Sequence, residues 1–207
     1  MNALSTPFTT TTAPIPAPQV WNPTPYHWNN DEFRILTEAG CFRDKFVMLI
    51  NGEIIEMANP SPKHRRSVGK VDYMLKSIFN TNHWVRVQDG LETSPDTNPC
   101  PDVAVLNGTP WTTPDSGEEV LLVVEVSDTS FAYDRGTKAH IYAAKSIQDY
   151  WVIDVNGRQL LRFRDPIADP SAPRGYRYAT QTTLTDQDTF SPLATAHAIV
   201  PVVQLLP

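Results

Sequence analysis

The spacing of apolar residues along the chain predicts where its helices lie. Val68, Val71, Leu75 and Ile78 recur at three- and four-residue steps, which indicates an amphipathic helix with one buried face. A shorter helix is predicted upstream, with acidic residues near its start and Gly40 just after its end. The predicted helices cover residues 30–39, 64–79 and 133–144.

Short apolar runs bounded by turn residues predict strands. Two of them flank Asn51-Gly52, a dipeptide that tolerates the positive φ of a tight hairpin, and Asn156-Gly157 predicts a second hairpin. Residues 120–126 are almost continuously apolar and β-branched, as in a central strand covered on both faces. The predicted strands cover residues 47–50, 53–57, 84–88, 102–106, 120–126, 150–154, 160–163 and 176–180. Together with the helices, this order predicts a mixed α/β fold with one sheet and helices against it.

Length and composition place this fold in one domain. The chain has 207 residues, 41% of them hydrophobic and 19% charged, which suits one globular α/β domain. Residues 1–27 are rich in Thr and Pro and lack periodicity, so we expect a flexible arm there and a single domain over residues 28–207. The formal net charge of −6 argues against tight nonspecific DNA binding, although a local basic groove stays compatible with it.

The sequence also bears on location. No apolar run is long enough to span a membrane, so we expect no membrane partner. The N-terminus lacks a basic region followed by an apolar core, which argues against export. We therefore expect Cys41 and Cys100 to be free thiols in a reducing cytoplasm.

Three ionisable residues stand out as candidates for chemistry. Glu125 lies inside the most apolar run of the chain, and a buried carboxylate needs a partner or a cation. Asp102 opens another short strand, so the two carboxylates converge if these strands are neighbours; otherwise each is a structural or turn residue. Two such carboxylates would supply the hard oxygen ligands that Mg²⁺ or Mn²⁺ prefers. Lys138 lies four residues after Asp134 on a predicted helix, where it either forms a solvated ion pair or reaches back toward the carboxylates.

Several segments in a fixed order resemble one bacterial family. They are 101–105 (PDVAV), 123–127 (VVEVS), 133–138 (YDRGTK), 142–143 (YA), 150–154 (YWVID), 52–57 (GEIIEM) with Ser61 and His64, and 38–40 (EAG). Over roughly residues 28–165, the chain resembles the Uma-type family of restriction-endonuclease-like proteins in the PD-(D/E)XK nuclease superfamily.

The resemblance implies a restriction-endonuclease-like core, a central mixed β-sheet flanked by helices, with an N-terminal helix and a β-hairpin. It implies a metal-dependent endonuclease that hydrolyses phosphodiester bonds, with Asp102 and Glu125 as metal ligands, Lys138 as the third catalytic residue and Mg²⁺ or Mn²⁺ as cofactor. It further implies a nucleic-acid substrate, which we expect to be DNA, and a homodimer as the assembly to test. The superfamily lysine two residues after the glutamate is Ser127 here, and Met48 stands where relatives carry a glutamate.

Other residues are weaker candidates for the same site. Glu53, His64, Gln88 and Ser127 are possible supporting residues. Since Glu53 and Glu56 are three positions apart on one strand, at most one of them faces the site. A local phosphate-steering rim is one interpretation of the basic residues near the first turn of the long helix and beyond, and solvated surface is the other. These residues are Lys63, Arg65, Arg66, Arg135, Arg158, Arg162 and Arg164. Tyr150 and Trp151 are expected in the core.

Two further functions were weighed against the nuclease. Met48, Ser127 and the acidic net charge favour a catalytically weakened or inactive nuclease-fold module that acts as a nucleic-acid or protein adaptor. Hydrolysis on a nucleophilic serine or cysteine has little support, because the chain has no Gly-x-Ser-x-Gly sequence and no evident base beside Cys41.

Overall fold

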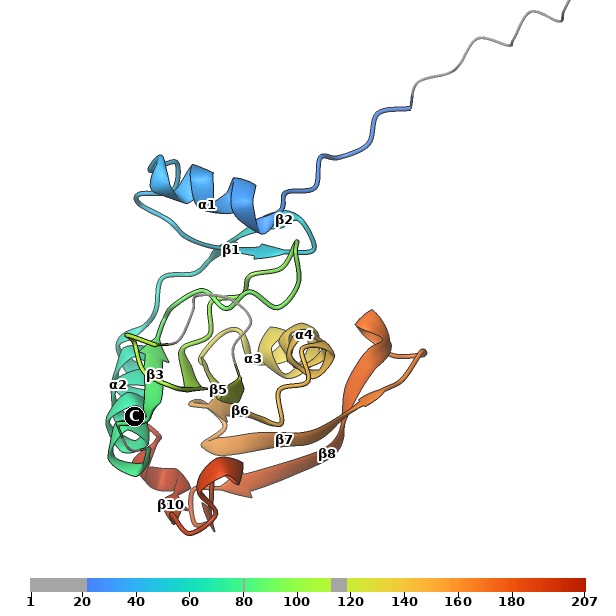
Figure 1. The fold of residues 1–207 in the computed structure, drawn as a ribbon. Helices are drawn as coiled ribbons and strands as arrows, with labels where there is room; N and C mark the ends of the chain where they lie inside the picture. The colour runs from blue at the N-terminus through green and yellow to red at the C-terminus, as the bar shows by residue number, and fades with distance from the viewer. Residues whose placement is uncertain (1–21, 80, 113–118) are drawn as a thin grey trace, which may run out of the picture.

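The computed structural model describes residues 22–79, 81–112 and 119–207 (Figure 1). Most of the predicted flexible arm, residues 1–21, lies outside the described residues. A central sheet has the strand order β3-β4-β5-β6-β7-β8, in which β5 and β6 are parallel and the other neighbours are antiparallel. Its strands are β3 (His83–Val87), β4 (Val103–Asn107), β5 (Val120–Ser127), β6 (Asp149–Asp154), β7 (Gln159–Ala168) and β8 (Tyr176–Thr185).

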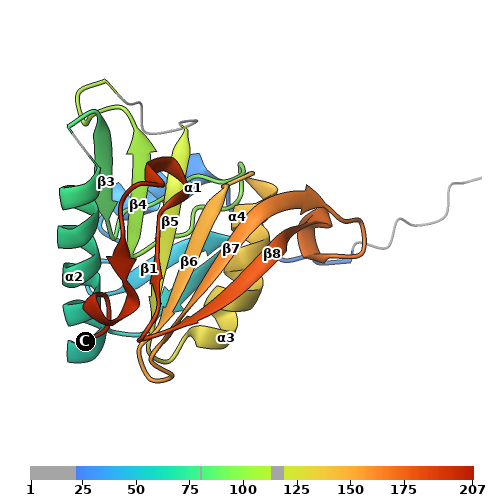
Figure 2. The ribbon, with the colours of Figure 1, turned by 90° about the horizontal axis from the view of Figure 1, so that it is seen from below.

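The first hairpin forms a two-stranded sheet of its own, β1 (Phe46–Ile50) paired with β2 (Glu53–Met57). Asn51 and Gly52 both have positive φ, 53° and 75°, as the tight turn requires. A Cβ at Gly52 would lie 2.7 Å from the Cβ of His27, so this turn accepts only glycine without rearrangement. The strand pattern predicted one sheet, whereas the hairpin is a separate sheet that lies over one face of the central sheet (Figures 1 and 2). The expected central mixed sheet with an N-terminal helix and a β-hairpin is confirmed.

One face of the central sheet is covered by the long helix α2 (Pro62–Ile78) and the C-terminal segment (Figures 1 and 2). The apolar stripe of α2 faces this layer, since Val68, Val71 and Leu75 are buried against alternate residues of β4 and β5. The C-terminal segment contains β9 (Thr189–Phe190), β10 (Val200–Pro201) and the short 3₁₀ helices Leu193–Thr195 and Val202–Gln204.

The other face carries the elements around which the candidate site is built. It is covered by the β1–β2 hairpin and by a crossover that joins β5 to β6, in three consecutive helical pieces. These pieces are α3 (Phe131–Tyr133), a π-helical turn (Asp134–Lys138) and α4 (Ala139–Ala144). The helix α1 (Asn30–Glu38) lies beside the hairpin and begins with a capping box between Asn29 and Glu32. A 3₁₀ turn, Pro173–Gly175, precedes β8.

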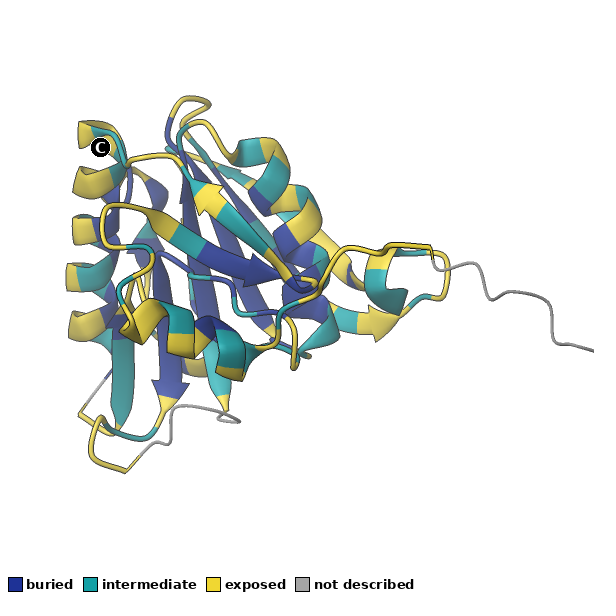
Figure 3. Cartoon of the chain, turned by 90° about the horizontal axis from the view of Figure 1, so that it is seen from above, coloured by how far each residue is buried: buried dark blue, intermediate teal, exposed yellow. Residues whose placement is uncertain are grey.

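The core is the sheet itself, whose middle strands are buried along their length (Figure 3). Tyr150 and Trp151 are fully buried on opposite faces of β6, which confirms that they belong to the core. Both cysteines are free, as expected. Among the described residues, no helix combines the length and apolar character needed to cross a membrane.

The connection between β6 and β7 differs from the predicted two-residue turn. Asp154 pairs with Gln159, so four residues form the turn, and positive φ falls on Arg158 and not on Asn156 or Gly157. The Asp154 carboxylate accepts hydrogen bonds from the backbone N–H groups of Asn156 and Gly157 and fixes this wider turn.

Candidate active site

The strand register brings the two carboxylates together. Val103 pairs with Val124 and Ala104 with Val123, so continuing this antiparallel register by one residue sets Asp102 opposite Glu125. Alternation along the strands directs both side chains to the face covered by the hairpin and the crossover, because Ala104 and Val123 pack there. Asp102 and Glu125 line one cavity of about 550 Å³ together with Lys138.

Lys138 is buried between two carboxylates. Its Nζ lies 2.8 Å from Glu125 Oε2 and 3.4 Å from Asp134 Oδ1, and its exposed fraction is only 5%. The alternative of a solvated ion pair with Asp134 therefore does not hold. Burial would lower the lysine pKa, but Glu125 and Asp134 outweigh this effect and raise it, so the ammonium stays charged at neutral pH.

Glu125 has a partner on each oxygen. Oε1 accepts a hydrogen bond of 2.6 Å from the hydroxyl of Tyr142, and Oε2 faces Lys138. Burial raises the Glu125 pKa to about 8; Lys138 opposes this rise, and the charges of Asp134 and Asp102 add to it. The carboxyl groups of Glu125, Asp134 and Asp102 thus lie near a single ammonium, that of Lys138. An added positive charge would reduce the repulsion among them.

Asp102 is held from two sides. Its Oδ2 accepts a hydrogen bond of 2.8 Å from the backbone N–H of Val126, and Nε2 of His64 lies 3.1 Å from both carboxylate oxygens. His64 occupies the first turn of α2, where Ser61 caps the helix by accepting from the His64 N–H. Burial lowers the His64 pKa, but Asp102, together with the charges of Asp128 and Asp134, more than offsets this and the net pKa is raised. Its other ring nitrogen, Nδ1, is buried without a hydrogen-bond partner among the described residues.

The π-helical turn sets the geometry of the lysine. Asp134 begins this turn and is anchored by the hydroxyls of Ser127 and Ser130, at 2.7 and 2.5 Å from its Oδ2. The Tyr150 hydroxyl also donates to the backbone carbonyl of Asp134. Isolated π turns of this kind occur frequently at functional sites. Here the turn directs both Asp134 and Lys138 into the protein.

The four supporting candidates differ in how they relate to the cavity. His64 and Gln88 line the cavity. The backbone N–H of Gln88 donates a hydrogen bond of 3.0 Å to the backbone carbonyl of Asp102. Ser127 is fully buried, and its hydroxyl donates a hydrogen bond to Asp134. Glu53 lies outside the cavity lining, whereas Glu56 lines it and pairs with Lys45.

The basic residues singled out from sequence do not form one rim. Arg164 bonds to buried Asp149, and Arg158 pairs with Asp186 at the far turn of the sheet. Both belong to β7 or the turn that precedes it, and β7 is an interior strand with β6 and β8 as neighbours. Arg135 lies over the ring of Phe131.

Asp134 and Tyr142 are site residues whose part the sequence analysis missed. They lie four residues before and four residues after Lys138, so one helical stripe carries all three. The four-residue spacing is visible in the sequence. Its relation to the site follows only from the structure, in which Lys138 and Tyr142 both contact Glu125. Cys100 also lines the cavity; burial raises its pKa to about 12, and the thiol is not poised as a nucleophile.

The donor set suits a hard divalent cation. Within residues 22–79, 81–112 and 119–207, no group of three or more His, Cys, Asp or Glu side chains forms a preassembled metal site. Mg²⁺, however, is commonly held by one or two carboxylates, with waters and substrate phosphate completing its shell. Asp102 and Glu125, in an acidic cavity open to solvent, fit this mode of binding.

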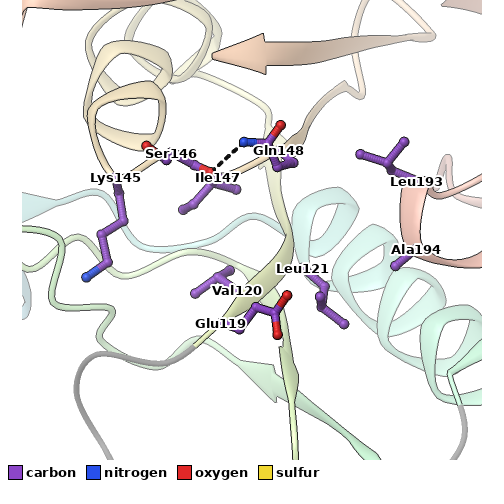
Figure 4. A pocket seen from close by; sticks show the side chains of 9 residues that line it. All are labelled: Glu119, Val120, Leu121, Lys145, Ser146, Ile147, Gln148, Leu193 and Ala194. Carbon is purple, nitrogen blue, oxygen red and sulfur yellow. Dashed lines mark hydrogen bonds between the residues drawn. The ribbon is translucent and has the colours of Figure 1, made fainter. Parts of the chain in front are cut away.

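A second cavity, of about 410 Å³, lies at the opposite end of β5 (Figure 4). Glu119 and Val120 precede or begin the strand there, and Lys145 to Gln148 follow α4. It holds one acidic and one basic residue with no convergence of carboxylates. The cavity around Asp102 is therefore the better candidate for chemistry.

Known proteins resemble this chain in fold and in sequence pattern. No curated protein matches it. A crystal structure described as "a putative nuclease belonging to DUF820 from Anabaena variabilis ATCC 29413" superposes with a TM-score of 0.64 at 16% identity, covering 86% of this chain and 97% of that one. At this identity the likeness shows a common fold. Residues 31–200 match the family model Uma2, described as "Putative restriction endonuclease". This match spans most of the chain, so the protein belongs to the Uma2 family, and its membership supports a nuclease.

Proposed function

We propose that this protein is a metal-dependent endonuclease that hydrolyses phosphodiester bonds of nucleic acid at Asp102, Glu125 and Lys138. The observation that carries the proposal is the buried ion pair of Glu125 and Lys138 at 2.8 Å, with Asp102 in the same cavity. Restriction-endonuclease-like proteins generally use divalent metals, and this donor set is compatible with one.

Asp102 and Glu125 would hold the metal ion. When bound, it would supply Lewis-acid polarisation of the phosphoryl group and activation of water. The chain's own residues prepare the surroundings. The Val126 N–H and His64 fix the Asp102 carboxylate, and Tyr142 orients Glu125.

Lys138 contributes charge and not proton abstraction. Since its pKa is raised, it carries its proton at neutral pH and cannot serve as a general base. A fixed ammonium in a buried site stabilises negative charge that develops on the phosphoryl oxygens in the transition state. Asp134 keeps this ammonium in place.

The test is cleavage of labelled DNA and RNA by purified protein with Mg²⁺ or Mn²⁺. We expect cleavage to be lost in Asp102→Asn and Lys138→Met, and retained in Glu53→Gln, an exposed carboxylate outside the cavity. Circular dichroism would verify that each variant is folded. Cleavage that persists in both site variants would refute the proposal.

A second candidate is a nuclease-fold adaptor without catalytic activity. Met48 favours it, because this residue is buried in the cavity wall where a glutamate would add a third acidic ligand. Calorimetry with Mg²⁺ and Mn²⁺ separates the two functions. A protein that binds nucleic acid but takes up neither metal, with or without nucleic acid, would be an adaptor.

A further inference from the structure

The reacting groups lie at the bottom of a cavity and not on an open surface. The exposed fractions of Asp102, Glu125 and Lys138 are 9%, 2% and 5%. The cavity above them has a volume of about 550 Å³. Pockets of roughly 300–1,000 Å³ accept small molecules, and a single nucleotide unit is of that size class. A scissile phosphate must therefore enter this space to meet the carboxylates.

The wall that faces the acidic groups is apolar. The register of the hairpin pairs Phe46 with Met57 and Met48 with Ile55, and these four side chains lie on one face because their positions alternate. All four line the cavity, as does Tyr133 from α3. Phe46 is 52% exposed, so an aromatic ring stands at the entrance while Met48 is buried behind it. Such a surface suits the flat face of a nucleobase and not a run of phosphates.

Charge around the entrance is mixed. Glu56 and Asp128 both line the cavity, and Glu56 is paired with Lys45 at 2.5 Å. A duplex lying over a site gains most of its affinity from many phosphate contacts with Lys and Arg. The mixed charge around the entrance and the net charge of −6 give little support to that mode. Single strands depend less steeply on such contacts than duplex DNA does, and stacking of each base on an aromatic ring adds affinity.

We propose that the substrate is an unpaired polynucleotide strand, which inserts a nucleotide so that its base packs on the hairpin face and its phosphate reaches Asp102 and Glu125. This inference rests on the proposed nuclease function. An uninterrupted duplex holds each base inside the stack, and its partner strand blocks entry into a cavity of this size. An unpaired strand can turn a base out at little cost.

The experiment compares one labelled sequence as a single strand, as a full duplex and as a duplex with a single-stranded overhang, each as DNA and as RNA, with Mn²⁺ present. We expect the single strand and the overhang to be cut at least about tenfold faster than the duplex, with cuts confined to unpaired nucleotides. Equal or faster cleavage of the duplex, or cuts within its paired part, would overturn the inference. The DNA and RNA arms identify which unpaired strand is preferred.

Binding to the Asp102→Asn variant, measured by fluorescence anisotropy, keeps the inference testable even if no substrate is cut. Tighter binding of the single strand than of the duplex supports it, and the reverse order overturns it. The absence of cleavage would count against the nuclease function alone. In the otherwise unchanged protein, Phe46→Ala should weaken single-strand binding by about fivefold or more, since stacking of one base contributes roughly 1–3 kcal/mol. Tyr73→Ala is the matched control, because Tyr73 is 79% exposed on α2 and does not line this cavity.

Discussion

The raised pKa of Glu125 makes a quantitative prediction about stability and pH. Its pKa is about 8 in the folded protein against an ordinary value of 4.5, chiefly because of burial. The unfolded chain therefore loses this proton at lower pH than the folded protein does. The native state is destabilised as pH rises through the window between 4.5 and 8, and the effect is constant above it. At about 1.36 kcal/mol for each pH unit, the whole effect amounts to about 5 kcal/mol.

Glu125→Gln removes this ionisation and keeps the shape of the side chain. The quantity to follow is the free energy of unfolding of the variant minus that of the unsubstituted protein, both without metal. We expect this difference to increase by about 4 kcal/mol as the pH is raised from roughly 5 to 8.5. The attraction of Lys138 for the ionised carboxylate is already part of the Glu125 pKa, and the contacts that the variant loses with the protonated carboxyl add a cost that varies little with pH. The change with pH, and not the absolute difference, therefore reports the ionisation of Glu125.

The assay is urea unfolding at several pH values in the presence of EDTA, monitored by tryptophan fluorescence, with Glu53→Gln as control for the substitution itself. The slope of free energy against urea concentration should be similar for both proteins, so that midpoints can be compared. A difference that is flat across this range, or that shrinks as pH rises, would show that Lys138 holds Glu125 ionised already at pH 5. The cavity would then hold no excess of negative charge.

Three other predictions concern the same network. Tyr142→Phe should cost about 1–3 kcal/mol in urea unfolding near neutral pH, since it leaves Oε1 of Glu125 buried and unpaired; a cost near zero would contradict this. Asp134→Asn should lower kcat by about tenfold with little change in KM, because Asp134 acts by positioning Lys138; a change confined to KM would argue otherwise. Millimolar Mg²⁺ should raise Tm by a few degrees, more at pH 8.5 than at pH 6 because Glu125 must lose its proton to bind, and Asp102→Ala should abolish the shift.

The sequence predicts elements well where the pattern is local. The Asn51-Gly52 hairpin and the stripe of α2 lie within two residues of their predicted bounds, because turn chemistry and helical periodicity are properties of short segments. The separate hairpin sheet and the wide turn before Gln159 depend on tertiary pairing and on the Asp154 side chain, which no short pattern encodes. The apolar residues around Glu125 in the sequence predicted that its carboxylate needs a partner. The partners themselves, and the raised pKa, depend on where the fold places Tyr142 and Asp134.

The position of the lysine follows from how the crossover packs on the sheet. Residues 123, 125 and 127 face the same side of β5, so a lysine at position 127 would share this face with Glu125. Ser127 is instead fully buried, and its short side chain donates to Asp134 at the beginning of the π turn. That contact holds the first residue of the π turn against β5. In the same turn, Nζ of Lys138 lies 2.8 Å from Oε2 of Glu125. A long side chain at 127 would occupy the space that this anchor needs. Ser127 therefore belongs to the set of contacts that holds Lys138 beside Glu125 in this fold.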